Sequence, residues 1–270
     1  MGKGAIRSAA EIEMARAAGG AAAHVLRMLV PRVKAGVSTD QLDNLCHDYI
    51  VGELKAVPAN IGFYGFPKTV CASVNHVVCH GIPSDRRLKD GDIINIDVAV
   101  MKDGWYGDTS RMYFVGQPSV LARRLVHATY EALCAGIRAV RPWARLGDVG
   151  NAIEQVARRE GFSVVRDYCG HGIGTAYHDE PQVLHFGRPG TGLLLEPGMI
   201  FTIEPILNAG GAATRVLADG WTVVSKDRSL SAQWEHMVVV TDSGFDVLSA
   251  WPDGYGEYTP IGKDASLPLF

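Results

Sequence analysis

Apolar residues recur at helical spacing in four stretches of the chain. The first begins at Ser8, which forms a capping box with Glu11, and its alanine-rich amphipathic pattern continues to about Val30. The second opens with the segment Ser-Thr-Asp-Gln at Ser38 and continues to about Leu54. The four predicted helices cover residues 8–30, 38–54, 118–140 and 147–160.

Shorter apolar runs, rich in β-branched and aromatic residues, lie between and after these helices and predict strands. The predicted strands cover residues 70–74, 93–100, 111–115, 162–166, 199–207, 221–225, 236–241 and 245–249. Residues 55–69 are rich in proline and glycine and are predicted as loop. Because no low-complexity linker divides the chain, we predict a single α+β domain over residues 1–270.

The composition argues against several classes of protein. The chain has 270 residues, of which 47% are hydrophobic and 20% charged, and its formal net charge of −3 gives no reason to expect binding to DNA or to a membrane surface. No apolar stretch approaches the ~20 residues of a membrane helix, and the N-terminal residues lack the apolar core of a secretory signal. The five cysteines are scattered without a C-x-x-C pair, so we expect a cytoplasmic protein without a disulfide framework.

Two segments, one in each half of the chain, repeat the same pattern. LKDGDIINIDV at residues 88–98 and LEPGMIFTIEP at residues 195–205 both read Leu-x-x-Gly-x-Ile-x-x-Ile-acid. A His-Gly-Ile triplet precedes each of them, at residues 80–82 and 171–173. Chance similarity of two strands is the alternative, but the paired triplets in the same order favour two related halves that face each other across a pseudo-symmetric site.

The repeated pattern ends in an acid that lies inside an apolar strand. Alternation along residues 93–100 places Asp97 on the face opposite the isoleucines and valines. In the second copy, Thr202 and Glu204 share one face while Phe201 and Ile203 share the other. For each strand taken alone, it is equally consistent with the pattern that the acid simply points to solvent from a sheet covered on one face.

Two further acids, Asp108 and Glu235, each stand just before a later predicted strand, so each half offers one pair of carboxylates. Four carboxylates brought together would repel one another, but divalent cations between them would make the cluster tolerable. His171, in a stretch with glycines on both sides that we predict as a loop, would add a nitrogen ligand. Oxygen donors with one imidazole favour manganese, iron, cobalt or zinc. The alternative is that the acids face water and the histidines fill space.

Longer motifs make the sequence recognisable as a family member. The segments FPKTVCASVNHVVCHGIP, GDIINIDVAVMKDGWYGDTSRMYFVG, YCGHGIGTAYHDEPQVLH and LEPGMIFTIEPIL, with the later KDGWTVVSKDRSLSAQWEH, resemble type I methionine aminopeptidases over about residues 4–250. The resemblance implies the pita-bread fold and two divalent metal ions. The residues that match the family's metal ligands are Asp97, Asp108, His171, Glu204 and Glu235.

The same resemblance implies how substrate is bound. Residues that match His80 and His178 contact the substrate in the family, and the glycines around His171 would let the chain pass close to the metals and the peptide. The implied lining of the methionine pocket is Phe63, Phe66, Cys71, Tyr177 and Trp221. Many members have tyrosine in place of Phe63 and some have cysteine in place of Asn60, which leaves the rim of the pocket open. Each aromatic residue is also a candidate for ordinary core.

The implied activity is removal of the N-terminal methionine from nascent proteins and peptides whose second residue is small. In this hypothesis a hydroxide generated at a dinuclear metal site attacks the methionyl carbonyl. His178 donates to the carbonyl oxygen, and Glu204 transfers the water's proton to the leaving amine. The implied partners are nascent chains and, transiently, the ribosome. We expect a monomer in which residues 1–250 form the matched catalytic domain and residues 251–270 a tail.

Three alternatives remain at the level of the sequence. A proline-directed peptidase of the same fold usually has a large N-terminal domain, for which this chain leaves no room before residue 62. A type II methionine aminopeptidase has a helical insertion that is missing here. A non-catalytic binding protein of this fold would lose metal ligands, whereas all five are present.

Overall fold

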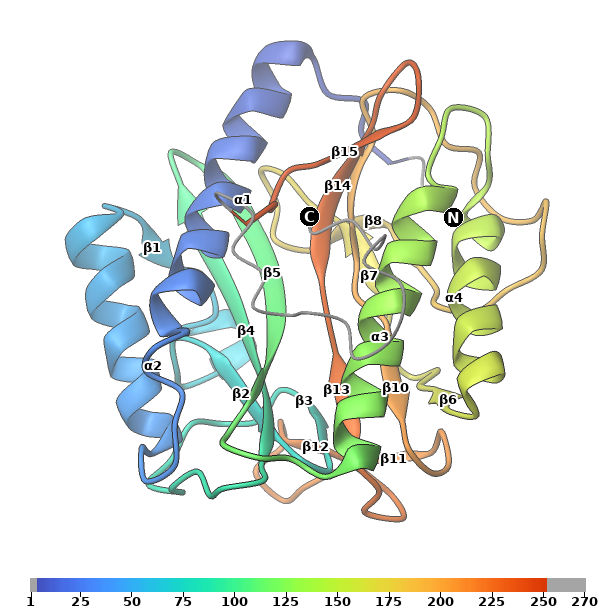
Figure 1. Ribbon diagram of the computed structural model, residues 1–270. Coiled ribbons are helices and arrows are strands. Elements are labelled where there is room, and N and C mark those ends of the chain that lie inside the picture. The colour runs from blue at the N-terminus through green and yellow to red at the C-terminus, as the bar shows by residue number, and fades with distance from the viewer. Residues whose placement is uncertain (1–3, 252–270) are drawn as a thin grey trace.

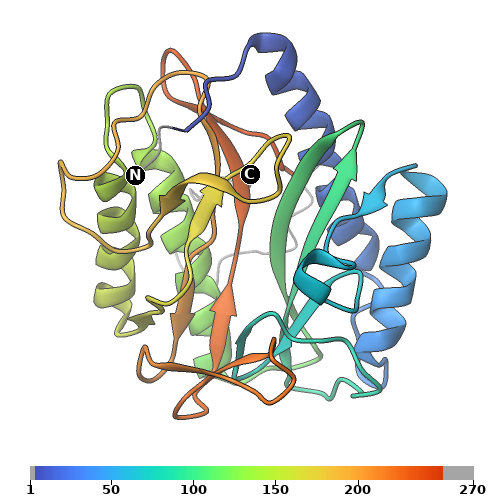
Figure 2. The ribbon, with the colours of Figure 1, turned by 180° about the vertical axis from the view of Figure 1, so that it is seen from behind.

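Two pairs of helices flank the strands from the two sides of the molecule (Figures 1 and 2). The structure is a computed structural model and describes residues 4–251. The first pair is α1 (Ala9–Leu29) and α2 (Thr39–Asp48), and the second is α3 (Val120–Ala139) and α4 (Leu146–Glu160). All four predicted helices are therefore confirmed, and a five-residue π-helix, Tyr49–Glu53, extends α2 to the predicted end.

Helices α1 and α2 begin where the sequence predicts caps. The Ser8 side chain accepts the backbone N–H of Glu11, and the Glu11 carboxylate accepts the N–H of Ser8 at 2.8 Å. Ser38 and Gln41 form the same reciprocal pair at the start of α2. No helix among residues 4–251 combines the length and the apolar character needed to cross a membrane.

The strands of the first half centre on a long antiparallel hairpin. Strand β4 (Ile93–Lys102) pairs with β5 (Trp105–Phe114) along its whole length, and on its other edge with β1 (Val57–Pro58) and β2 (Cys71–Val74). The short strand β3 (Val77–Cys79) leaves this sheet to pair with a strand of the second half.

The strands of the second half form the matching arrangement in shorter pieces. Strand β9 (Ile200–Ile203) pairs with β14 (His236–Val240), and β10 (Ile206–Asn208) pairs with β13 (Ser231–Gln233). An isolated bridge between Ser110 and Glu235 joins the two halves. The remaining strands are β6 (Ser163–Val164), β7 (Gly170–Gly172), β8 (Asp179–Val183), β11 (Thr214–Val216), β12 (Val223–Ser225) and β15 (Phe245–Val247).

The predicted relation between the halves is visible in matched backbone contacts. The N–H of Leu88 donates at 2.8 Å to the carbonyl oxygen of Val37, the residue before the N-cap of α2. The N–H of Leu195 donates at 2.8 Å to the carbonyl oxygen of Ala144, the residue before the N-cap of α4. Gly91 and Gly198, which occupy the same place in the repeated pattern, both have φ of 90°. Left-handed backbone is costly for any residue with a Cβ, which explains the shared glycine.

Each half has its own apolar core. The cluster between α1, α2 and the first hairpin includes Ile94, Ile96, Val98 and Val100, as the alternation in β4 predicts. The cluster between α3, α4 and the second half includes Phe201 and Ile203. Trp251, predicted as the start of the tail, is buried in this second cluster. Residues 252–270 of that tail lie outside the described residues.

Three predictions about the strands that carry the site are wrong. Strand β5 begins at Trp105 rather than at residue 111, so Asp108 lies inside the strand and not before it. The predicted strand 199–207 is broken at Glu204, because Pro205 has no N–H for a ladder hydrogen bond. His171 lies in strand β7 rather than in a loop.

The glycines on either side of His171 are needed for packing between strands. A Cβ on Gly170 would lie 2.3 Å from the Thr202 carbonyl oxygen, and one on Gly172 would lie 2.0 Å from that of Glu180. The glycines therefore allow the close approach of the backbones beside β7, a packing reason that the sequence analysis did not foresee.

Candidate metal centre

Four carboxylates converge where the two halves meet. Asp97 lies in β4 opposite Ser110 of β5, and Asp108 lies two residues from Ser110 on the same face. Glu204 lies in the break after β9, and Glu235 immediately precedes β14, as predicted. Asp108 and Glu235 are only 3% and 2% exposed.

Three sets of side chains offer ligand atoms that all lie within 4.8 Å of one another. The first set is Asp97, Asp108 and Glu235, and the second is His171, Glu204 and Glu235. The third joins Asp108 and His171 to His178. Because Glu235 belongs to the first two sets, it stands where one carboxylate can serve two neighbouring ions.

Burial and mutual repulsion act on all four carboxylates. Burial raises the pKa of Asp108 to about 7, and burial together with the charge of Asp108 raises the pKa values of Asp97, Glu204 and Glu235. Oδ1 of Asp108 and Oε1 of Glu235 are buried and accept no hydrogen bond from the described residues. Neither lysine nor arginine is among the described residues that line the cavity. A buried donor set of this kind fits divalent cations.

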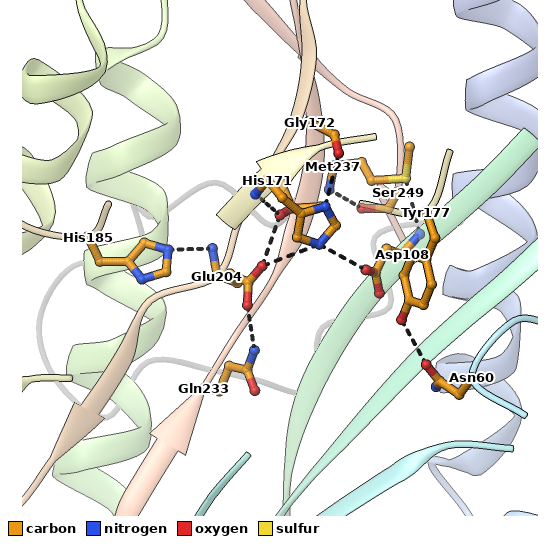
Figure 3. A network of polar contacts seen from close by, with 11 residues as sticks. Asn60, Asp108, His171, Gly172, Tyr177, His185, Glu204, Gln233, Met237 and Ser249 are labelled. Atoms are coloured by element: carbon orange, nitrogen blue, oxygen red, sulfur yellow. Dashed lines mark hydrogen bonds and ion pairs between the residues drawn. The ribbon is translucent and has the colours of Figure 1, made fainter. Parts of the chain in front are cut away.

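His171 is oriented for a role as a nitrogen ligand (Figure 3). Its Nδ1 lies 3.0 Å from the Gly172 carbonyl oxygen, which selects the tautomer with the proton on Nδ1. Nε2 then carries the lone pair, and it lies 3.6 Å from Oδ2 of Asp108 and 3.7 Å from Oε1 of Glu204. Burial lowers the pKa of His171 to about 4, so the ring is neutral near pH 7, as metal binding requires.

Thr202 connects two of the candidate ligands. Its hydroxyl accepts the backbone N–H of His171 at 3.0 Å and donates to Oε1 of Glu204 at 3.0 Å. Oε2 of Glu204 accepts a hydrogen bond from Nε2 of Gln233 at 3.4 Å. The backbone N–H of Glu204 donates to Nε2 of His185 at 3.2 Å. These contacts fix the direction of the Glu204 carboxylate.

Replacing Thr202 with valine is therefore expected to weaken metal binding. The variant keeps the shape of the side chain but leaves Glu204 and the His171 backbone without their shared partner, and loss of such a contact typically costs about 10–100-fold in metal affinity. Calorimetric titration of metal-free protein with Mn²⁺ measures this change. Thr202→Ser keeps the hydroxyl and should bind like the wild type. Equal affinity of the valine variant would contradict this role of Thr202.

The carboxylates lie in a cavity of about 660 Å³ that also contains the other predicted site residues. The structure thus brings together every residue that the sequence singled out, and separates none. The residues are Phe63, Phe66, Cys71, His80, Asp97, Asp108, His171, Tyr177, His178, Glu204, Trp221 and Glu235.

Aromatic rings form the wall of the cavity beyond the carboxylates. Phe63 packs on Tyr177 with ring centroids 4.7 Å apart, and Phe66 packs edge-on against Trp221 at 5.1 Å. The His80 ring lies 5.5 Å from that of Tyr168. Burial lowers the pKa of His80 and of His178 to about 4, so both imidazoles are neutral near pH 7.

Several residues that line the cavity were not singled out from the sequence, among them Tyr168, Gln233 and Asn60. Tyr168 and Gln233 lie close in the chain to His171 and Glu235, inside motifs that the sequence analysis quotes. Asn60 was noted only as a departure from the family, whereas its amide makes two buried hydrogen bonds. No local pattern marks these residues, because their partners come from distant segments.

A cluster of buried carboxylates with one imidazole, between two related halves, is the arrangement of a metal-dependent hydrolase. The family comparison is specific: the model of metallopeptidase family M24 matches residues 13–242, so the chain belongs to that family.

Named relatives agree with this assignment. The methionine aminopeptidase of Salmonella typhimurium is 55% identical over 249 residues, which are 92% of this chain and 94% of the relative. The crystal structure of methionine aminopeptidase from Rickettsia prowazekii superposes with a TM-score of 0.90 at 51% identity, covering 92% of this chain and all of that one. The prolidase of Pyrococcus furiosus, at 19% identity and a TM-score of 0.72, shares the fold. The predicted pita-bread fold is thereby confirmed.

Proposed function

We propose that this protein is a methionine aminopeptidase that removes the N-terminal methionine when the second residue is small. The observation that carries the proposal is the set of five candidate ligands at the bottom of an aromatic cavity. The high identity to methionine aminopeptidases over almost the whole chain supports the same substrate. The prolidase is only 19% identical to this chain, so its likeness supports the fold and gives no argument for proline-directed cleavage.

Membership of family M24 implies a divalent metal, and we propose two ions in this chain. Asp97, Asp108 and Glu235 would hold one ion, and His171, Glu204 and Glu235 the other, with Asp108 also in reach of both. Cobalt, manganese, iron and zinc all suit these donors. Bound ions would supply Lewis acidity, which lowers the pKa of water towards ~7.

Protein groups would supply the remaining chemistry. The neutral imidazole of His178 donates a hydrogen bond to the peptide carbonyl oxygen as negative charge develops there. The carboxylate of Glu204 accepts the proton of the attacking water and returns it to the leaving amine. His80, neutral and beside Trp221, orients the scissile amide. Their positions in one cavity support these roles.

The pocket for the first side chain suits methionine. Its lining presents aromatic faces and one thiol, and such surfaces accept a flexible, polarisable thioether. The lining residues are Phe63, Phe66, Cys71, Tyr177 and Trp221. We further propose that the chain works as one catalytic domain, as a cytoplasmic monomer that meets nascent chains at the ribosome.

The proposal predicts release of free methionine from the peptide Met-Gly-Met by protein loaded with Mn²⁺ or Co²⁺. Met-Leu-Met should be cleaved at least about a hundredfold more slowly, because the larger second residue displaces the scissile bond from the reacting position. Acetylated Met-Gly-Met and the dipeptide Ala-Pro should remain intact. Amino-acid analysis of timed samples measures each rate. Cleavage of Ala-Pro with no methionine release would contradict the proposal.

A further inference from the structure

A buried chain of hydrogen bonds connects helix α2 with the cavity. Oδ1 of Asp43 accepts the backbone N–H of Thr69 at 2.8 Å, and the Thr69 carbonyl oxygen accepts Nδ2 of Asn60 at 3.1 Å. Oδ1 of Asn60 in turn accepts the hydroxyl of Tyr177 at 2.7 Å (Figure 3). The four residues are 4%, 1%, 6% and 9% exposed, so the chain is shielded from competing water.

The last member of this chain is the neighbour and packing partner of His178. The Tyr177 and His178 ring centroids lie 4.4 Å apart. The other rings against His178 are Phe63 at 5.0 Å and His171 at 4.1 Å. No hydrogen bond from the described residues holds the His178 imidazole. His178 is an exposed residue, so the orientation of its imidazole depends on the rings that pack against it.

Tyr177 is fixed at both its face and its tip. Its ring stacks on Tyr106 with an interplanar angle of 4°, which sets the plane of the ring but lets it slide within that plane. The hydroxyl bond to Asn60 stops this sliding. A phenylalanine would fill the same space without this constraint, and it would leave Oδ1 of the buried Asn60 without its partner.

The bond also joins the two halves across the wall of the cavity. Asn60 precedes β2 in the first half, and Tyr177 lies between β7 and β8 in the second half. The turn that follows Asn60 carries Phe63, which contacts both Tyr177 and His178. This hydrogen bond, together with the backbone bond from the N–H of Tyr106 to the Gly174 carbonyl oxygen at 2.8 Å, connects the two walls that hold the His178 ring.

We propose that Asn60 and Tyr177 are positioning residues that hold the His178 imidazole in the direction needed for the transition state. The inference rests on the proposed function for its kinetic consequences. It assigns to the Tyr177 hydroxyl a role beyond lining the methionine pocket.

Tyr177→Phe tests the role because it removes only the hydroxyl. We expect kcat for Met-Gly-Met to fall about fivefold, the usual worth of one intramolecular hydrogen bond, with KM changed by less than about twofold. Tyr113→Phe is the matched control, because the Tyr113 hydroxyl donates to the Leu26 carbonyl oxygen at 2.6 Å in a buried region away from the cavity. The control should keep the wild-type kcat.

The same substitution in a His178→Ala background separates positioning from general damage. If Tyr177 acts through His178, Tyr177→Phe causes no further loss of kcat in that background. An equal loss in both backgrounds, or an equal loss in Tyr113→Phe, overturns the inference.

A measurement that needs no turnover distinguishes this inference from the proposed function. In zinc-loaded protein with ¹³C-labelled histidine, the His178 ring resonances should shift in Tyr177→Phe and stay in place in Tyr113→Phe. An unmoved His178 resonance overturns the positioning role whatever the activity. A shifted resonance in a protein that releases no methionine refutes the proposed function and leaves the positioning role standing.

Discussion

Asp108→Asn is expected to lower the rate of methionine release by roughly a thousandfold or more. Asp108 has ligand atoms near both proposed ions, and its amide replacement offers a neutral, weaker donor at that place. Loss of several kcal/mol of transition-state stabilisation corresponds to this factor. Steady-state rates with saturating Mn²⁺ measure it. Loss of less than about tenfold would contradict a ligand role for Asp108.

The same substitution should stabilise the metal-free protein at neutral pH. Burial raises the pKa of Asp108 to about 7, so its charged form is disfavoured in the folded state and readily formed in the unfolded state. Below pH about 4 the carboxyl is protonated in both the folded and the unfolded state, so its burial as a charge costs no stability. As pH rises from about 4 to about 7, the unfolded state loses the proton first and the free energy of unfolding falls. Asparagine has no such loss.

The melting temperature of metal-free Asp108→Asn should therefore exceed that of the wild type by roughly 5–10 °C at pH 7.5, and the difference should vanish near pH 4. Asp92→Asn is the matched control, because Asp92 is also buried but accepts Nδ2 of Asn75 and the N–H of Lys89. That variant should gain no stability and should keep its activity.

Addition of Mn²⁺ should raise the melting temperature of the wild type by roughly 10–20 °C at pH 7.5. Two ions, each at about a hundred times its dissociation constant, contribute about 5 kcal/mol together. The shift should shrink to a few degrees at pH 5, because the pKa of Asp108 is raised to about 7 and this carboxyl holds its proton there, which a metal ion must displace. Burial and the charge of Asp108 raise the pKa values of Asp97, Glu204 and Glu235 in the same direction.

Histidine titration does not produce this pH dependence. The pKa of His171 is lowered to about 4, so the folded protein holds the neutral ring at both pH 5 and pH 7.5. Differential scanning fluorimetry after treatment with a chelator and stepwise return of Mn²⁺ gives the shifts. Asp108→Asn should show a much smaller shift at pH 7.5. A shift of equal size at both pH values would mean that ions bind elsewhere than at these carboxylates.

Local sequence patterns were sufficient for the helices and for the strand that carries Asp97. Capping residues and apolar spacing act within one turn of the chain, so they are readable without tertiary contacts. Alternation in β4 placed Asp97 on the face opposite Ile94, Ile96, Val98 and Val100, as the structure has it. The strand is nevertheless buried on both faces, because Ile93, Asn95 and Ala99, which share the face of Asp97, are buried as well.

The missed elements depend on contacts between distant segments. Strand β7 consists of Gly170, His171 and Gly172, a composition typical of loops. It pairs with β8 and β9, whose backbones lie so close that neither glycine position could carry a Cβ. Strands β11 and β13 are three residues each and are defined by their partners. The hydrogen bond from Tyr177 to Asn60 joins residues 117 positions apart, so only the folded chain reveals it.

We propose that carboxylates from both halves, with His171, hold a pair of ions in the cavity. A crystal structure of the metal-loaded protein, with anomalous maps collected at the absorption edge of the metal, will locate these ions. We expect two peaks ~3.5–4 Å apart, both contacted by Glu235 and Asp108, with His171 and Glu204 on one and Asp97 on the other. Peaks far from Glu235, or the absence of any peak at a pH at which the four carboxylates are charged, would contradict this proposal.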